Sequence, residues 1–182
     1  LKAGEAPEIW NLTNPDKITE IHKAYLEAGA DIITSNTFGV NCEKYENFAE
    51  LIEAGISCVK NAINGKAEKF AALDIGPTGR LLEPLGDLSF QRAVEIFAEN
   101  VKAGVKAGAD LIIIETMNDS LETKAAVLAA KENSSLPVFV TNVYDEGGNL
   151  MTGADPLAMV AMLEGLRVDA LGLNCSLGPD KM

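Results

Sequence analysis

The sequence has one histidine and three cysteines in 182 residues, and both counts exclude common kinds of site. His22 has no second histidine to help it bind a metal, and a nucleophilic cysteine would lack an evident base. The cysteines are odd in number and lie far apart, from Cys42 to Cys175. They therefore do not form the disulfide framework typical of a small secreted domain.

Positive charge is also scarce, with 15 Lys and Arg against 27 Asp and Glu and a formal net charge of −12. Nucleic acids and anionic membrane surfaces are bound by clustered positive charge, so neither is expected as a partner. No apolar run is long enough to span a membrane, and no basic and then apolar leader opens the sequence. These absences predict a cytoplasmic protein.

One pattern recurs along the chain: an amphipathic segment, a turn of small residues, and a short β-branched run that ends in polar residues. It is seen in "AYLEAGADIITSNTFG", "AGVKAGADLIIIETMND" and "MLEGLRVDALGLNCSLG", where Asp31, Asp110 and Asp169 each enter the apolar run. Two similar runs lie between these copies. The pattern predicts five strands, at residues 31–37, 70–75, 110–116, 137–143 and 169–175.

Helices are predicted between the strands. Asn14 and Pro15 are typical of a helix start, with asparagine as N-cap and proline in the first turn. The apolar stripe of this first helix is expected at Ile18, Ile21, Tyr25 and Leu26. Helical spacing of apolar residues, or a cap, predicts four more helices, at residues 45–63, 90–105, 120–131 and from 156 onward.

Apolar strands that alternate with helices indicate parallel strands buried on both faces. An open doubly wound sheet and a closed (β/α)₈ barrel both fit this pattern. No Gly-x-Gly-x-x-Gly loop follows the first strand, which disfavours the doubly wound sheet. A barrel typically needs about 250 residues, and the first fourteen residues lack any period. We therefore expect an α/β fold, an incomplete (β/α)₈ TIM barrel cut at both ends, with residues 1–182 as one partial barrel domain.

In such a barrel, chemistry collects at the carboxyl ends of the strands. Polar residues end every predicted strand, at positions 35–38, 74–79, 115–117, 141–144 and 174–176. Glu115 follows "LIII", and a carboxylate placed there needs a cation, either a structural Lys or Arg or a substrate ammonium. Asp74 has the same position after "FAAL", although aspartate is also common in turns. Cys175 stands at a strand tip, where a thiolate can be a nucleophile or metal ligand or have no role, whereas Cys42 and Cys58 are typical of core positions.

Four segments in order, "ADIITSNTFG", "DIGPTGRLLEPLG", "ETMNDSLETKAAVLAA" and "ALGLNCSLGP", resemble the zinc-dependent homocysteine S-methyltransferases. The resemblance is strongest to the homocysteine-binding module of the cobalamin-dependent methionine synthases. It implies a (β/α)₈ barrel in which three cysteine thiolates hold zinc. Cys175 matches the first of these ligands, and the adjacent pair that supplies the other two is absent from a sequence that ends at Met182.

The resemblance also implies the reaction and the roles of the site residues. Zinc, with Cys175 as a ligand, activates the homocysteine thiol, which accepts a methyl group from methylcobalamin to give methionine. Glu115 receives the substrate ammonium, and the pocket is lined by Asn174, Thr37, Phe38 and Asp74. The expected partners are homocysteine and the cobalamin- and folate-binding modules of the same full-length protein. Two alternatives stay open: a cobalamin-independent methyltransferase that uses betaine or S-methylmethionine, and a non-catalytic barrel fragment.

Overall fold

The computed structural model describes residues 4–182. Its helical elements are η1 (Pro7–Ile9), α1 (Trp10–Thr13), α2 (Pro15–Glu27), α3 (Phe48–Ile63), α4 (Phe90–Ala107), α5 (Ser120–Asn133) and α6 (Pro156–Gly165). The strands are β1 (Ile32–Thr34), β2 (Phe70–Ile75), β3 (Leu111–Met117), β4 (Val138–Asn142) and β5 (Ala170–Leu173).

The five strands form one sheet in the order β1-β2-β3-β4-β5, and every neighbouring pair is parallel. The predicted fold class is therefore confirmed: the described residues form four consecutive βα units of a barrel and the strand of a fifth. All five strands were predicted, and most differ from the prediction by only a residue or two at their ends. The clearest difference is β1, which ends at Thr34 because the chain turns there through residues 35–38.

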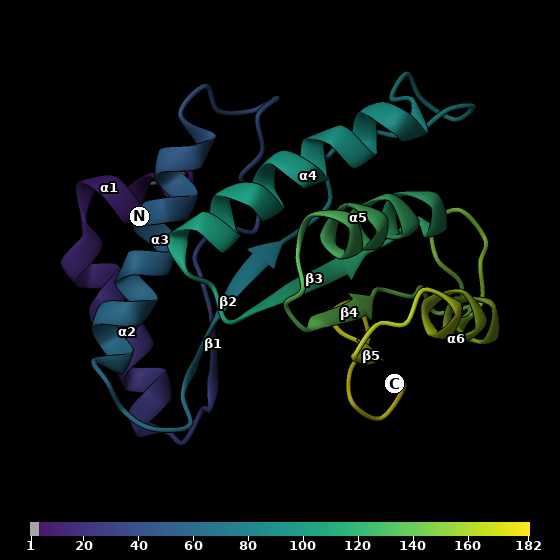
Figure 1. Ribbon diagram of the computed structural model, residues 1–182. Coiled ribbons are helices and arrows are strands. Elements are labelled where there is room, and N and C mark those ends of the chain that lie inside the picture. The colour runs from purple at the N-terminus through teal and green to yellow at the C-terminus, as the bar shows by residue number, and fades with distance from the viewer. Residues whose placement is uncertain (1–3) are drawn as a thin grey trace.

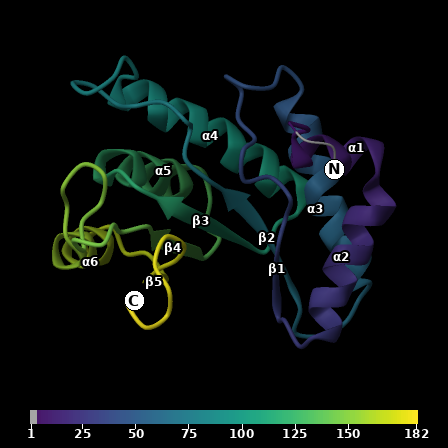
Figure 2. The ribbon, with the colours of Figure 1, turned by 180° about the vertical axis from the view of Figure 1, so that it is seen from behind.

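The helices form an arc around one side of the sheet, with α2 and α3 next to β1 and α6 next to β5 (Figure 1). Figure 2 shows the same arrangement from behind, and no helix of residues 4–182 covers the opposite side of the sheet. The main core lies between the helices and the sheet, and it includes fully buried Ile56, Leu73, Phe97 and Ile112. None of the helices in residues 4–182 combines the length and the apolar character needed to cross a bilayer.

The aspartates that enter the strands act as connectors between neighbouring βα units. Asp110 Oδ2 accepts hydrogen bonds from the backbone N–H of Ala71 (2.8 Å) and from Lys60 Nζ (2.7 Å). Asp169, two strands further along the chain, repeats this arrangement. Its Oδ2 accepts hydrogen bonds from the N–H of Val138 and from Lys131 Nζ. The hydrogen bond from the N–H of Val138, and then the one from Lys131, lower the pKa of Asp169. The repeated aspartate therefore helps to set the register between parallel strands.

Helix α2 begins at Pro15 as predicted, but its buried face differs from the predicted stripe. Ile21 and Tyr25 are 50% and 61% exposed, and His22 is buried in their place. The buried positions, Ile18, His22 and Leu26, have the same helical spacing one row around the helix. Sequence pattern alone does not distinguish these rows because apolar residues occupy both.

The segment before α2 is more ordered than its lack of period suggested. It contains η1 and α1, which are too short for periodicity to detect. Asn11 Nδ2 donates hydrogen bonds to the carbonyl oxygens of Asn36 (2.8 Å) and Leu51 (3.2 Å), so this segment holds the turn after β1. Residues 1–3, which the same prediction covers, lie outside the described residues.

Two glycines offer a matched test of backbone strain. Gly108 ends α4 at φ +88°, whereas Gly165 lies at the end of α6, and a Cβ would meet open space at both. Gly108→Ala is expected to lower the free energy of unfolding by about 1 kcal/mol, because only the left-handed backbone penalises the methyl group. Gly165→Ala is expected to raise it by about 0.5 kcal/mol through helix propensity. Urea unfolding of both variants measures the two changes, and equal effects would contradict the backbone argument.

Candidate active site

Two carboxylates meet at the carboxyl ends of β2 and β3. Asp74 pairs in register with Ile113, and Glu115 lies two residues further along β3 on the same face of the sheet. The side chain of Asp74 is buried, with 6% exposure, and its Oδ1 has no hydrogen-bond partner in the described residues. Burial, and then the charge and hydrogen-bonding reach of Glu115, raise the pKa of Asp74 well above its usual value.

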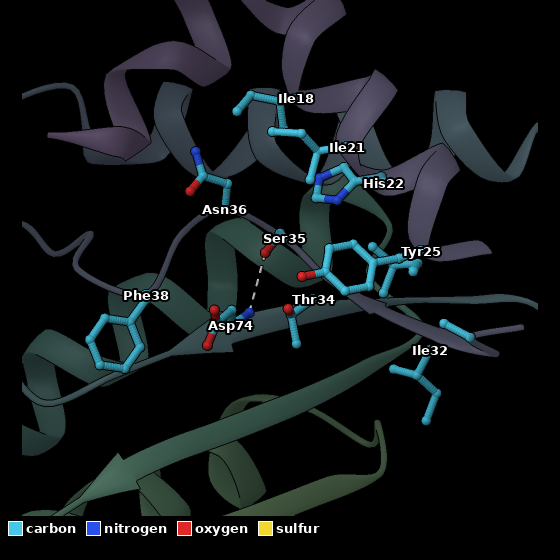
Figure 3. Close-up of a pocket in the computed structure, with 12 residues that line it drawn as sticks. Ile18, Ile21, His22, Tyr25, Ile32, Thr34, Ser35, Asn36, Phe38 and Asp74 are labelled. Carbon is cyan, nitrogen blue, oxygen red and sulfur yellow. Dashed lines mark hydrogen bonds between the residues drawn. The ribbon is translucent and has the colours of Figure 1, made fainter. Parts of the chain in front are cut away.

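The backbone of Asp74 is held by two hydroxyl groups from the turn after β1. Its N–H donates to Ser35 Oγ (3.2 Å), drawn as the dashed line in Figure 3. Its carbonyl oxygen accepts from Thr37 Oγ1 (2.8 Å), and the two hydroxyls are 2.7 Å apart. The Thr37 hydroxyl is therefore fully engaged in the protein, and the role that this geometry shows for Thr37 is to position Asp74.

A groove of about 310 Å³ opens beside Asp74 and runs between α2 and β1. Its walls include Ile21, His22, Tyr25, Thr34 and Phe38, which surround the cavity in Figure 3. Burial lowers the pKa of His22 to about 4, so the imidazole in this wall is neutral at physiological pH. The groove thus combines an apolar wall with one buried carboxyl group.

Phe38 closes the end of the groove near the strand tips. Its ring packs against Gly76, where a Cβ would lie only 2.5 Å from the ring. The first glycine of "DIGPTG", Gly76, is therefore required so that Phe38 can approach the strand that carries Asp74. Phe38 keeps 41% exposure and lines the groove.

Asn174 does not line the groove beside Asp74 but the depression that Cys175 also lines. Its Oδ1 accepts from the N–H of Thr116 (3.2 Å), and its Nδ2 donates to Thr116 Oγ1 (2.9 Å). Thr116 adopts a left-handed conformation at φ +59°, next to a shift of register between β3 and β4. This pair of bonds ties the end of β5 to the residue that follows Glu115.

Cys175 is exposed and has a φ of +63°. It lines a separate depression of about 100 Å³, whose other walls include Tyr144 and Lys181. Cys58 is buried in α3, where its Sγ lies 3.6 Å from the carbonyl oxygen of Pro15, and Cys42 is half-buried. In residues 4–182 no three His, Cys, Asp or Glu side chains come together as a metal site. Among the three cysteines, Cys175 is thus the exposed one, and the described residues bring no group of metal-binding side chains around it.

The structure therefore divides the predicted residues into groups. Asp74 and Glu115 are adjacent, and Phe38 lies beside the same groove as Asp74. Asn174 contacts the strand of Glu115, and Cys175 opens into the neighbouring depression.

Sequence reasoning missed Glu8, which lies in η1 and is 7% exposed. Its Oε1 accepts a hydrogen bond from the N–H of Gly39 (2.9 Å), and its charge also raises the pKa of Asp74. No signal of period or motif marks this residue. Ser35 and Thr116 were visible as strand-end residues, but their contacts depend on neighbouring strands.

Residues 2–182 match the family described as Homocysteine S-methyltransferase. The chain belongs to this family. The resemblance found in its four motifs is thereby confirmed. A methionine synthase of Mycobacterium leprae is 31% identical over 190 residues, and one of Mycobacterium tuberculosis is 30% identical. Each alignment covers 96% of this chain and 16% of the relative, so the chain spans about one sixth of these proteins' length.

A solved structure supports the fold of this family member. The metallated form of the homocysteine methyltransferase MmuM from Escherichia coli superposes with a TM-score of 0.84 at 20% sequence identity. The match covers all of this chain and 71% of that one. The arrangement of strands and helices in this homocysteine S-methyltransferase family member is therefore the one found in that enzyme.

Proposed function

We propose that residues 1–182 are part of the homocysteine-binding barrel domain of a methionine synthase, in which a homocysteine thiolate accepts a methyl group. The observation that carries this proposal is the pair Asp74 and Glu115. Two carboxyl groups meet at the strand ends of a barrel, and no lysine or arginine among residues 4–182 forms an ion pair with either. A buried carboxylate without a protein cation favours a ligand that brings its own, and homocysteine carries an ammonium group.

The substrate sulfur is proposed to lie toward Cys175. A zinc ion held by thiolates would bind the substrate sulfur and favour its thiolate form, which is the better nucleophile. Cys175 is proposed as one of these ligands, and no group of three His, Cys, Asp or Glu side chains within residues 4–182 completes the set. The resemblance of "NCSLGP" to the family motif supports this assignment, as does the exposed position of Cys175 at the end of β5.

This chain's own residues bind and orient the amino-acid end of the substrate. Glu115 and Asp74 receive the ammonium, and Phe38 covers the groove beside them. Asn174 and Thr37 act one step away, since Asn174 holds the chain at Thr116 and Thr37 holds the backbone of Asp74. An ammonium fixed at one end and a sulfur at the other would leave little freedom to the thiolate, which favours attack on a correctly placed methyl group.

The methyl donor is proposed to be methylcobalamin, bound by another module of the full-length protein, with a further module that binds folate. One support is the similarity to two mycobacterial methionine synthases, in which the alignment with this chain covers 16% of the length. The other is that the "DIGPTG" and "NCSLGP" segments resemble those of the cobalamin-dependent enzymes. A protein of this kind would act in the cytoplasm.

The test is a methyl-transfer assay on the complete protein with homocysteine and, in turn, methylcobalamin, betaine and S-methylmethionine. Methylcobalamin alone is expected to support turnover. Cys175→Ala is expected to lower turnover and bound zinc by more than about 100-fold, since removal of a ligand should exceed the effect of its supporting contacts. The half-buried Cys42 provides the control, because Cys42→Ala should retain both. Turnover with betaine or S-methylmethionine would contradict the proposed donor, and full zinc in Cys175→Ala would contradict the proposed ligand.

A further inference from the structure

Asp74 combines three features that the fold alone does not require. Asp74 is buried, with 6% exposure, and it borders the groove between α2 and β1. Its Oδ1 lacks any partner in the described residues, whereas its backbone groups are satisfied by Ser35 and Thr37. A buried acceptor without a donor is costly, so this oxygen needs either a proton or an external cation.

The groups that face Asp74 supply no positive charge. Glu115 faces it from β3 and Glu8 from η1, and both disfavour its ionised form. His22 from α2 lines the same groove and is neutral near pH 7, since burial lowers its pKa to about 4. The turn after β1 contributes only the hydroxyl groups of Ser35 and Thr37. Two carboxylates in contact in such surroundings do not both stay ionised.

We propose that Asp74 and Glu115 share one proton in the empty site, and that the ammonium of an amino-acid thiol replaces this proton when it binds. The inference rests on the proposed function, because it assumes that homocysteine is the ligand. It adds that recognition of the ammonium is an exchange of one cation for another. The two carboxyl groups and their bound cation carry a net charge of −1 before and after the exchange.

The proton balance follows directly. In the empty site one carboxyl holds the proton and the other is ionised. On binding, the O–H bond breaks, both carboxylates accept hydrogen bonds from the ammonium, and the proton passes to solvent. A thiol that ionises at a metal also releases a proton, so the two sources must be separated. Substitution of Asp74 separates them because it removes only the carboxyl proton.

The experiment is calorimetric titration of the complete protein with homocysteine in buffers of different ionisation enthalpy, which counts released protons. Asp74→Asn keeps the size of the side chain and the backbone contacts of Asp74. It is expected to release about one proton fewer per homocysteine than the wild type at the same pH. Asp31→Asn makes the same change in charge at the opposite end of the sheet, where the side chain is 74% exposed and pairs with Lys69. It should release as many protons as the wild type.

The outcomes separate this inference from the proposed function. Equal proton release in wild type and Asp74→Asn, with homocysteine bound by both, would overturn the shared proton and leave the function standing. Absence of homocysteine binding to the wild type would overturn both. If Asp74→Asn does not fold, infrared difference spectra of the wild type with and without homocysteine test the shared proton instead. The carbonyl band of a protonated carboxylic acid should be lost on binding, and an unchanged band would refute the inference.

Discussion

Glu115→Gln in the complete protein is expected to weaken homocysteine binding roughly 10- to 150-fold while zinc content stays unchanged. The side chain would keep its size and polar atoms but lose its charge. A charge-assisted bond between a carboxylate and an ammonium contributes about 1.5 to 3 kcal/mol, which corresponds to that range of affinity. Glu115 is half-buried beside Asp74, so solvent does not fully replace the lost interaction.

The measurement is a calorimetric titration with homocysteine, together with metal analysis of the same samples. Glu95→Gln is the matched control, since Glu95 lies on the outer helix α4 and is half exposed beside Arg92. It should bind homocysteine as the wild type does. Unchanged affinity in Glu115→Gln, with zinc retained, would count against Glu115 as the ammonium site.

The 182-residue chain by itself is expected to hold no zinc after dialysis and to show no methylation of homocysteine. A tight zinc site needs several thiolates in tetrahedral geometry. Cys175 is the one cysteine at the strand ends, while Cys58 is buried in α3 and Cys42 lies before that helix. Metal analysis and a thiol-methylation assay on the same purified sample test the expectation. Stoichiometric zinc that disappears in Cys175→Ala would show that further ligands exist within this chain.

The same isolated chain is expected to self-associate or to be poorly stable. In residues 4–182 no further strand pairs with the outer edges of β1 and β5. Apolar residues are exposed at the start of β2, at the end of β5 and on α6, with Phe70 at 45%, Leu173 at 41% and Leu157 at 79%. Unpaired edges and exposed apolar groups favour association between copies. Light scattering across a concentration series measures this, and a stable monomer at all concentrations would contradict it.

The sequence by itself determined the strands, their parallel order and most helix positions. Short β-branched runs that alternate with capped helices leave few topologies, because a parallel strand needs a crossover of helical length. Asp155 illustrates a purely local signal: its side chain accepts a hydrogen bond from the N–H of Ala158 and begins α6 at Pro156, as the pair of residues predicts. Gly108 likewise takes the left-handed conformation expected of a helix-ending glycine. These features depend on contacts within a few residues.

Only the tertiary structure decided how the candidate site is assembled. Sequence placed Asp74 and Glu115 at strand ends, but their contact depends on the register between β2 and β3. Glu8 joins them from the three-residue helix η1, which is too short for a periodic signal, and the Thr37 hydroxyl donates to the backbone of Asp74. The hydrophobic period of a sequence indicates which residues are buried. The direction of each polar side chain depends instead on the hydrogen-bond partner that a neighbouring strand provides. That partner can be thirty or more positions away, so local pattern does not contain it.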